Sequence, residues 1–294
     1  MAADWLSGSM TALVTPFKDG AVDFDTYATL IERQIAAGTK AVIPVGTTGE
    51  SATLTVDEHM AVIRACAETV NKRIPVIAGA GANDTPTAIA LAKTAASAGA
   101  DAVLAVTGYY NRPPQAGIIG HYEALANATE LPIIVYNVPG RTCSDIAVDT
   151  LATLSEHPKI VGVKDATGNL ARVAQQRLAC TEGFVQISGE DITAVGFNAM
   201  GGQGCISVTA NVTPKLCAQL QEACLAGDYQ TALLLQDRLT ALHDALFSDT
   251  NPAPVKYALA RLGLIHEELR LPLVHAAPEA RAAVDEALIG LNLL

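Results

Sequence analysis

A lysine ends an apolar segment in the middle of the chain. Lys164 follows the apolar or small residues 160–163 and precedes the polar, glycine-containing turn at 165–168, a pattern typical of a buried strand that ends in an amine. Lysine is rarely buried unless something demands it. Taking an ammonium out of water disfavours its charged form, and the neutral amine attacks carbonyl carbons. The first hypothesis is therefore an enzyme that forms a Schiff base on Lys164.

Three further groups fit carbonyl chemistry. Tyr136 is a candidate proton carrier, because imine formation needs a proton for the departing hydroxyl and a base for the incoming amine. A phenol releases its proton reluctantly at neutral pH, so Thr47 and a second tyrosine are candidates for a hydrogen-bonded relay. Thr47 and Thr48 lie in a Gly-Thr-Thr-Gly turn whose backbone N–H groups and hydroxyls suit a carboxylate. Arg141 can bind another carboxylate through two parallel hydrogen bonds.

These residues follow short apolar runs that recur along the chain. Each run leads into a small or polar turn and an alanine-rich amphipathic stretch, and a strand–helix unit takes about 30 residues. Eight such units predict a (β/α)8 TIM barrel, and no Gly-x-Gly-x-x-Gly follows an early strand to favour an open doubly wound sheet. The expected strands are residues 10–15, 41–45, 75–78, 102–106, 132–136, 160–164, 184–188 and 204–208.

Polar residues mark the starts of several expected helices. Thr55 and Glu58 have the spacing of a capping box, and Thr85 and Thr213 each place a capping hydroxyl before a proline. Residues 228–294 continue as helix-like segments without strand signals or a low-complexity linker. The sequence therefore predicts a catalytic barrel over residues 1–227 and a C-terminal helical region over residues 228–294, packed on the barrel or on a neighbouring subunit.

In a barrel of this kind the carboxyl ends of the strands form one mouth, where chemistry takes place. The residues alone leave simpler interpretations open. Lys164 could reach solvent or pair with Asp165, Tyr136 could be a mouth aromatic with its hydroxyl in water, and Arg141 could be a surface cation. The Gly-Thr-Thr-Gly turn could serve only as a strand-to-helix connection. The convergence of these groups on one mouth favours the functional interpretation.

The composition excludes several other classes of protein. A net charge of −11 over 294 residues argues against a nucleic-acid partner. No apolar run reaches the roughly 18 residues of a membrane span, and the N-terminus lacks the pattern of a signal peptide. The six cysteines include no Cys-x-x-Cys pair, which favours reduced thiols in a cytoplasmic protein. The six histidines are dispersed, so we expect neither a metal nor a cofactor.

Together these residues resemble the superfamily of pyruvate-dependent class I aldolases that contains dihydrodipicolinate synthases and N-acetylneuraminate lyases, and the similarity is greatest to the dihydrodipicolinate synthase family. One block alone would be a weak match, but all of them occur in order over essentially the whole chain. The blocks are Val14–Pro16, Val45–Ser51, Tyr109–Pro113, Tyr136–Thr142, Gly162–Lys164, Gly201–Gly204, Asn251–Pro252 and Leu271–Leu273.

The resemblance implies a lyase of lysine biosynthesis by way of diaminopimelate. Pyruvate would form an imine with Lys164, which would tautomerise to an enamine and attack the aldehyde of L-aspartate 4-semialdehyde. Cyclisation would release 4-hydroxy-tetrahydrodipicolinate. Pyruvate and the semialdehyde are thus the expected partners, with no cofactor.

The resemblance also implies a role for each site residue and a homo-oligomer. Tyr110 would come from the neighbouring subunit, which implies a tetramer built from tight dimers. Gly108 stands where the family usually has proline, so the loop that carries Tyr110 would be looser. By the same resemblance Tyr136 would carry protons together with Thr47 and Tyr110. Thr47 and Thr48 would hold the pyruvate carboxylate, and Arg141 would hold the semialdehyde carboxylate. Gly189 and Ile206 would contribute backbone groups near the imine.

Many members of the family bind lysine at a subunit interface. Here Val56 and Thr87 occupy positions where lysine-sensitive bacterial members often have histidine and glutamate. The ligand ammonium would lack a carboxylate partner, so we expect weak or absent inhibition by lysine. The positions that correspond to the regulatory site are Ser51, Ala52, His59, Asn83 and Tyr109.

Two other functions remain as alternatives. A related lyase would keep the imine but act on 2-keto-3-deoxy sugar acids, N-acetylneuraminate or hydroxyglutarate-type substrates. Arg141 favours the synthase, because it suits a second, short carboxylate better than a long polyol. A non-catalytic barrel that senses a keto acid would have no need of the proton relay formed by Tyr136 and Thr47.

Overall fold

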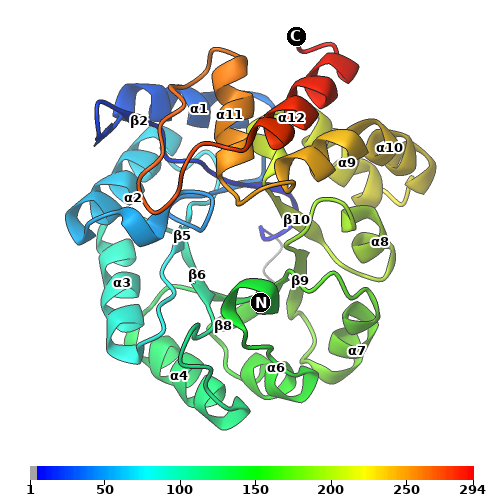
Figure 1. The fold of residues 1–294 in the computed structure, drawn as a ribbon. Coiled ribbons are helices and arrows are strands. Elements are labelled where there is room, and N and C mark those ends of the chain that lie inside the picture. Colours follow the sequence, from blue (N-terminus) through cyan, green and yellow to red (C-terminus); the bar gives the residue numbers. More distant parts are fainter. Residues whose placement is uncertain (1–4) are drawn as a thin grey trace.

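Eight parallel strands form a ring in the computed structural model, which describes residues 5–294 (Figure 1). They hydrogen-bond in the order β4-β1-β10-β9-β8-β7-β6-β5. The strands are β1 (Gly8–Ala12), β4 (Ala41–Ile43), β5 (Ile77–Gly79), β6 (Ala102–Val106), β7 (Ile133–Asn137), β8 (Ile160–Asp165), β9 (Val185–Ser188) and β10 (Gly204–Ser207).

The two strands at the ends of that order, β4 and β5, meet and complete the barrel. A parallel bridge joins Val42 to Val76, and the Val42 N–H donates to the carbonyl of Pro75 at 3.1 Å. An open doubly wound sheet would leave these two edges apart. The predicted (β/α)8 barrel is confirmed.

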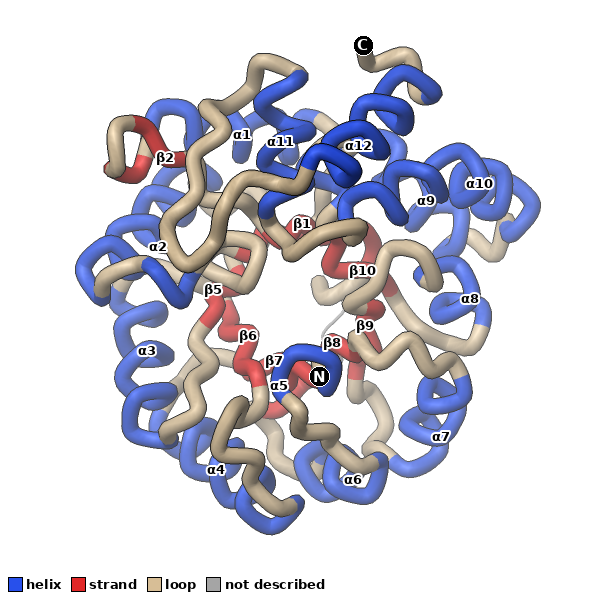
Figure 2. Tube along the Cα trace, in the orientation of Figure 1, coloured by secondary structure: helices blue, strands red, loops and turns tan. Residues whose placement is uncertain are grey.

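Helices surround the strands (Figure 2). A short antiparallel hairpin, β2 (Phe17–Lys18) with β3 (Ala21–Val22), was not predicted. The surrounding helices are α1 (Phe24–Ala36), α2 (Val56–Val70), α3 (Thr85–Ser97), α4 (Gln115–Ala128), α5 (Pro139–Thr142), α6 (Val148–Ser155), α7 (Ala171–Ala179), α8 (Ala194–Ala199) and α9 (Pro214–Leu225), with 3-10 turns η1 (Ser51–Thr53) and η2 (Thr209–Asn211).

Alternate residues of the strands fill the inside of the barrel. Met10, Ile43, Leu104 and Ile134 belong to one buried apolar cluster. Val42, Val103 and Val135, which stand next to Ile43, Leu104 and Ile134 along their strands, belong to a different cluster that includes residues of the helices, as the period of two along a strand requires. The closed apolar interior places any ligand site above it, at the carboxyl ends of the strands.

The first two expected strands run too far at their C-terminal ends. Residues 13–15 and 44–45 were assigned to strands but lie in loops. Leu13, Val14 and Val45 are buried there, so their apolar character reflects a buried loop. Val45 also has a φ of 49°, which a strand does not allow.

The predicted helix starts have mixed outcomes. The capping box of Thr55 and Glu58 is confirmed. At α3 the prediction was wrong, because the N-cap is Asp84, whose carboxylate accepts the Thr87 N–H, and Thr85 is the first helical residue. Thr213 is the N-cap of α9 but its hydroxyl makes no capping hydrogen bond.

The chain ends in three further helices, α10 (Tyr229–Leu246), α11 (Ala253–Arg261) and α12 (Pro278–Gly290). Leu242, Leu259 and Leu288 of these helices share one hydrophobic cluster with Leu220 of α9 and Val208 after β10. The helices therefore pack on the barrel, and the division at residue 227 stays a prediction. Within residues 5–294, no helix has both the length and the apolar character needed to cross a membrane.

Candidate active site

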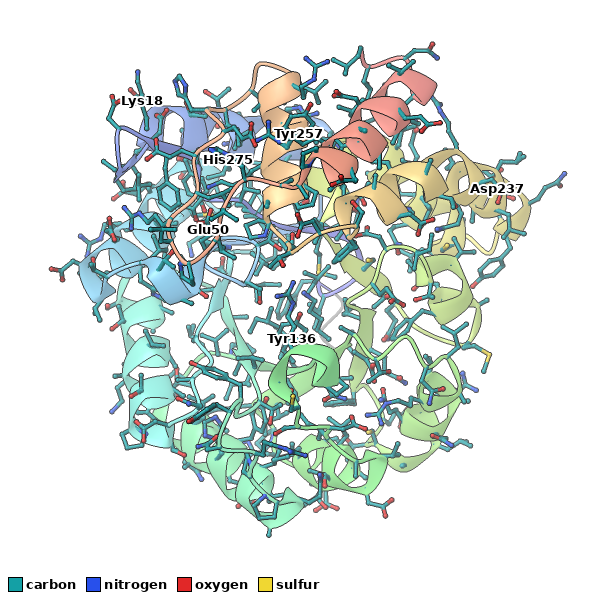
Figure 3. All side chains as sticks on the ribbon, viewed as in Figure 1. Lys18, Glu50, Tyr136, Asp237, Tyr257 and His275 are labelled. Atoms are coloured by element: carbon teal, nitrogen blue, oxygen red, sulfur yellow. The ribbon has the colours of Figure 1, made fainter. Side chains whose placement is uncertain are left out.

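Lys164 and Tyr136 lie side by side at the mouth of the barrel. Strands β7 and β8 pair in a register that aligns Tyr136 with Lys164. The ammonium nitrogen of Lys164 is 4.3 Å from the centroid of the Tyr136 ring. The two residues are 7% and 9% exposed. In Figure 3 Tyr136 lies beside α5, near the centre of the ring of strands.

Asp165 does not neutralise Lys164. The alternation of strand β8 turns Asp165 away from the barrel interior, where its carboxylate accepts Arg172 Nε at 3.0 Å and Gln176 Nε2 at 2.7 Å. It also accepts the backbone N–H of Thr167 at 2.9 Å. Among residues 5–294 no carboxylate forms an ion pair with Lys164, so the simple pairing considered from the sequence is excluded.

A glycine makes room for the lysine side chain. A Cβ placed on Gly189 would lie 3.0 Å from Cε of Lys164 and 2.7 Å from Cβ of Ala166. The second distance is shorter than real contacts allow. Any larger residue at the end of β9 would push the lysine or the β8 loop out of place.

The turn at residues 46–50 closes tightly on itself. The N–H groups of Gly49 and Ser51 both donate to the carbonyl of Gly46, at 3.1 and 3.3 Å. Thr15, in the loop after β1, holds the turn, since its hydroxyl donates to the Gly49 carbonyl at 2.7 Å. Val45 and Glu50, which flank the turn, have φ values of 49° and 55°. A β-branched residue in this conformation costs about 1–3 kcal/mol, so surrounding contacts must hold the turn.

One large cavity of about 950 Å³ brings most of the predicted residues together. Its volume lies at the upper end of the usual range for small-molecule sites. Across residues 5–294 no group of three or more histidine, cysteine or acidic side chains could hold a metal ion. The predicted catalytic and binding residues that line the cavity are Thr47, Thr48, Tyr136, Arg141, Lys164 and Gly189.

Two predicted residues do not line the cavity of this chain. Tyr110 is 91% exposed, with a φ of 72°, and lies on the loop between β6 and α4. Ile206 is buried inside the barrel, on β10. Neither position tests the role that the resemblance implies, and both roles stay predictions.

The positions expected to form a regulatory site mostly line the same cavity. Ser51, Ala52, His59 and Tyr109 do so, together with the two substituted positions, Val56 and Thr87. Burial lowers the pKa of His59. Asn83 is the exception: it is absent from the lining, and its carbonyl accepts Asn111 Nδ2 at 2.8 Å.

The sequence predicted no role for Asn251, although Asn251-Pro252 is one block of the family resemblance. The side chain is buried, lines the cavity, and donates from Nδ2 to the Thr48 hydroxyl oxygen at 3.0 Å. No spacing rule connects two residues 203 positions apart. The only available signal was a polar residue before a proline in a region otherwise read as helical.

Comparison with known proteins decides the family. The model of the dihydrodipicolinate synthetase family matches residues 5–290. The chain belongs to this family. A relative from Parvibaculum lavamentivorans, named 4-hydroxy-tetrahydrodipicolinate synthase, is 57% identical over 287 residues, which cover 98% of this chain and 99% of the relative. The predicted membership is confirmed.

Solved structures of dihydrodipicolinate synthases have the same fold. The chloride-inhibited enzyme from Acinetobacter baumannii, complexed with pyruvate, has a TM-score of 0.96 at 46% identity, over 98% of this chain and 100% of that one. The enzyme from Cyanidioschyzon merolae, with lysine bound, has a TM-score of 0.95 at 38% identity, over 99% of both chains. The predicted synthase function, of the lyase class, is confirmed by these names.

Proposed function

We propose that this member of the dihydrodipicolinate synthetase family condenses pyruvate with L-aspartate 4-semialdehyde through a Schiff base on Lys164. The observation that carries the proposal is the Lys164 amine, which lies in the cavity 4.3 Å from the centroid of the Tyr136 ring and forms no ion pair with a carboxylate of residues 5–294. An amine in this setting can add to a carbonyl carbon once it loses its proton.

The reaction balances over five steps. The Lys164 amine adds to C2 of pyruvate and water leaves, which gives the imine. A methyl proton is lost to form the enamine, whose carbon bonds to the aldehyde carbon of the semialdehyde while the aldehyde oxygen gains a proton. The amino group of the semialdehyde then attacks C2, and the Lys164 amine departs. The sum is pyruvate plus semialdehyde giving 4-hydroxy-tetrahydrodipicolinate and one water.

Tyr136 moves the protons in these steps. Its ring contacts the Lys164 ammonium, so its hydroxyl lies close to the atoms that gain and lose protons. Thr47 lines the same cavity and extends the relay. The exposed Tyr110 completes the relay of a neighbouring subunit, in a homotetramer built from tight dimers. The protein works in the cytoplasm, a location supported by six cysteines without a Cys-x-x-Cys pair, which favour reduced thiols.

The two substrate carboxylates bind to different groups that line the cavity. Thr47 and Thr48 offer hydroxyls and backbone N–H groups to pyruvate. Arg141, on α5, lines the cavity and binds the semialdehyde carboxylate. Gly189 and Ile206 supply backbone groups near the imine. A lyase for 2-keto-3-deoxy sugar acids, N-acetylneuraminate or hydroxyglutarate-type substrates would use the same lysine with another acceptor.

Borohydride reduction in the presence of pyruvate tests the proposal. The reduced pyruvate adduct is expected on the peptide that contains Lys164, and nowhere else, by mass spectrometry. Turnover is then measured with aspartate semialdehyde and with sugar-acid substrates. An adduct on another lysine overturns the mechanism, and faster turnover of a sugar acid overturns the choice of acceptor.

We also propose that lysine inhibits this enzyme weakly. The part of the cavity lined by Ser51, His59 and Tyr109 carries Val56 and Thr87 where a cationic ligand would need a carboxylate. A lost charged hydrogen bond costs about 1.5–3 kcal/mol, or roughly 10- to 150-fold in affinity. Strong inhibition by millimolar lysine would overturn this proposal.

A further inference from the structure

The C-terminal helical region reaches back to the turn that carries Thr47 and Thr48. Asn251, between α10 and α11, donates from Nδ2 to Oγ1 of Thr48 at 3.0 Å. Five residues later Lys256 of α11 donates from its ammonium to Oε1 of Glu50 at 2.5 Å. The two contacts hold both ends of the segment from Thr48 to Glu50, and Figure 1 shows α11 crossing this side of the barrel.

The contact between Asn251 and Thr48 has a direction that matters for ligand binding. A hydroxyl has one proton and two lone pairs. Because the Thr48 oxygen accepts from Asn251, its own proton remains free, and within residues 5–294 it donates to no protein atom. Thr48 and Lys164 both line the cavity, so that proton is available to an acceptor bound there.

We propose that Asn251 is a positioning residue for the keto-acid carboxylate: it orients the Thr48 hydroxyl as a donor into the cavity. The inference rests on the proposed function and names a part of the same site that neither the sequence nor the family match assigned. Asn251 acts through Thr48, and its buried Oδ1 has no hydrogen-bond partner in the described chain.

The surroundings of Asn251 hold it where this role requires. The Ala253 N–H donates to the Thr250 carbonyl at 2.9 Å, which closes the turn into α11. The Lys256 ammonium, besides Glu50, donates to the Glu268 carbonyl at 2.7 Å and lies 4.2 Å from the centroid of the Phe17 ring. Helix α11 is therefore fixed to the barrel within one and a half turns of Asn251.

Replacement by aspartate gives the sharpest test, because aspartate has the same shape but only accepts hydrogen bonds. In Asn251→Asp the carboxylate takes the Thr48 proton and places a negative charge beside the pyruvate carboxylate. We expect the KM for pyruvate to rise roughly 30-fold or more, with the KM for aspartate semialdehyde within about twofold. In Asn251→Ala we expect a rise of about 10-fold, because the hydroxyl is no longer oriented.

A double-mutant comparison separates orientation from general damage. In Thr48→Val the hydroxyl is absent, so adding Asn251→Ala should change the KM for pyruvate by less than about twofold. Thr48→Ser keeps the hydroxyl and should keep the sensitivity to Asn251→Ala. Asn198→Ala is the matched control: Asn198 is also a buried amide with an unpartnered Oδ1, but it donates to Gln221 and does not line the cavity.

Borohydride trapping distinguishes failure of this inference from failure of the proposed function. If the wild-type protein is not trapped on Lys164, the proposed function fails. If the wild type is trapped and Asn251→Asp needs roughly 30-fold more pyruvate for half-maximal trapping, the inference holds. If both need the same pyruvate concentration, or if the two single variants act additively, the inference is wrong. Circular dichroism confirms that each variant is folded, and the isosteric aspartate variant decides should the alanine variant not fold.

Discussion

Two buried lysines of this protein have opposite surroundings. Lys164 and Lys256 each hold an ammonium over an aromatic ring, at 4.3 Å from Tyr136 and 4.2 Å from Phe17. Lys256 is fully buried and paired with Glu50, whereas Lys164 is 7% exposed, opens on the cavity and has no carboxylate partner in the described chain. Burial and an aromatic neighbour are common to both, so the counter-charge and the open cavity distinguish the lysine that we propose to be reactive from the structural one.

The electrostatics of Lys256 follow from its surroundings. Burial lowers the pKa of its ammonium, and the Coulombic attraction and hydrogen bond of Glu50 oppose that shift. The ion pair also secures Glu50 at a φ of 55°, where a non-glycine residue is strained. A second hydrogen bond, from the Arg270 N–H to Oε2 of Glu50 at 3.1 Å, comes from the same C-terminal region. Lys256 thus stabilises the turn that carries Glu50, whereas Lys164 has no ion-pair partner among residues 5–294.

The largest expected effect is loss of the reactive lysine. Lys164→Ala should lower kcat roughly 10³-fold or more, because among residues 5–294 no other lysine lines the cavity to form the imine. Its free energy of unfolding should change little, because no ion pair is broken. Steady-state kinetics and urea denaturation measure the two quantities. Substantial activity in the purified variant would contradict the assignment of Lys164 as the reactive lysine.

Loss of the Tyr136 hydroxyl should have the second largest effect on kcat. Tyr136→Phe keeps the ring under the ammonium but removes the proton carrier, so kcat should fall roughly 10²- to 10⁴-fold. Because the ring remains, borohydride should still trap pyruvate on Lys164, only more slowly. Single-turnover trapping rates measure the effect. A kcat within threefold of the wild type would remove Tyr136 from the mechanism.

Replacement of Lys256 should have the reverse effect, with a large loss of stability and little change in Schiff-base formation. Lys256→Met leaves the buried Glu50 carboxylate without its partner and should cost about 3–5 kcal/mol of unfolding free energy in urea titrations. The fraction that remains folded should still form the Schiff base on Lys164. Adding Glu50→Gln should restore part of the loss, since no buried charge remains.

Lys72→Met is a matched control for that variant. Lys72 pairs with Asp101 at 2.9 Å, but its side chain is mostly exposed. Exposed pairs contribute about 0–1 kcal/mol, so this change should be nearly silent. If both methionine variants were equally stable, the Lys256–Glu50 pair would not be the anchor that we describe.

The smallest effect concerns acid stability at the edge of the same region. Two hydrogen bonds from Arg270 lower the pKa of Glu58 from 4.5 to about 2. A carboxylate with a lowered folded-state pKa stabilises the fold above its unfolded pKa, and this stability is lost as pH falls from 4.5 towards 2. Glu58→Gln should flatten that part of the pH profile, by about 1 kcal/mol because the pair is partly exposed. An unchanged profile would contradict the assignment.

The sequence predicted which residues lie at the mouth of the barrel, because the position of each depends only on the strand that it ends. Lys164 and Tyr136 each end an apolar strand, and parallel strands bring their carboxyl ends together. The direction of Asp165 follows from the same alternation, although the sequence analysis left its pairing with Lys164 open.

Contacts between distant segments could not be predicted in the same way. Asn251 and Lys256 meet Thr48 and Glu50 across 203 and 206 residues, and no periodic pattern encodes that meeting. The prediction of the N-cap of α3 was wrong for the opposite reason, because two adjacent residues can both cap the helix. The carboxylate of Asp84 forms the capping hydrogen bond that was assigned to Thr85.

The late position of Lys256 has a consequence for any shortened version of the protein. A chain that stops after α9 has all eight barrel strands and the amine of Lys164, but it lacks Lys256, the buried cation that pairs with the Glu50 carboxylate. Such a fragment would expel that charge to water and open the turn beside it. A minimal barrel built from this protein must therefore carry a neutral residue at position 50, and during synthesis the contacts of Asn251 with Thr48 and of Lys256 with Glu50 form only after residue 256 has emerged.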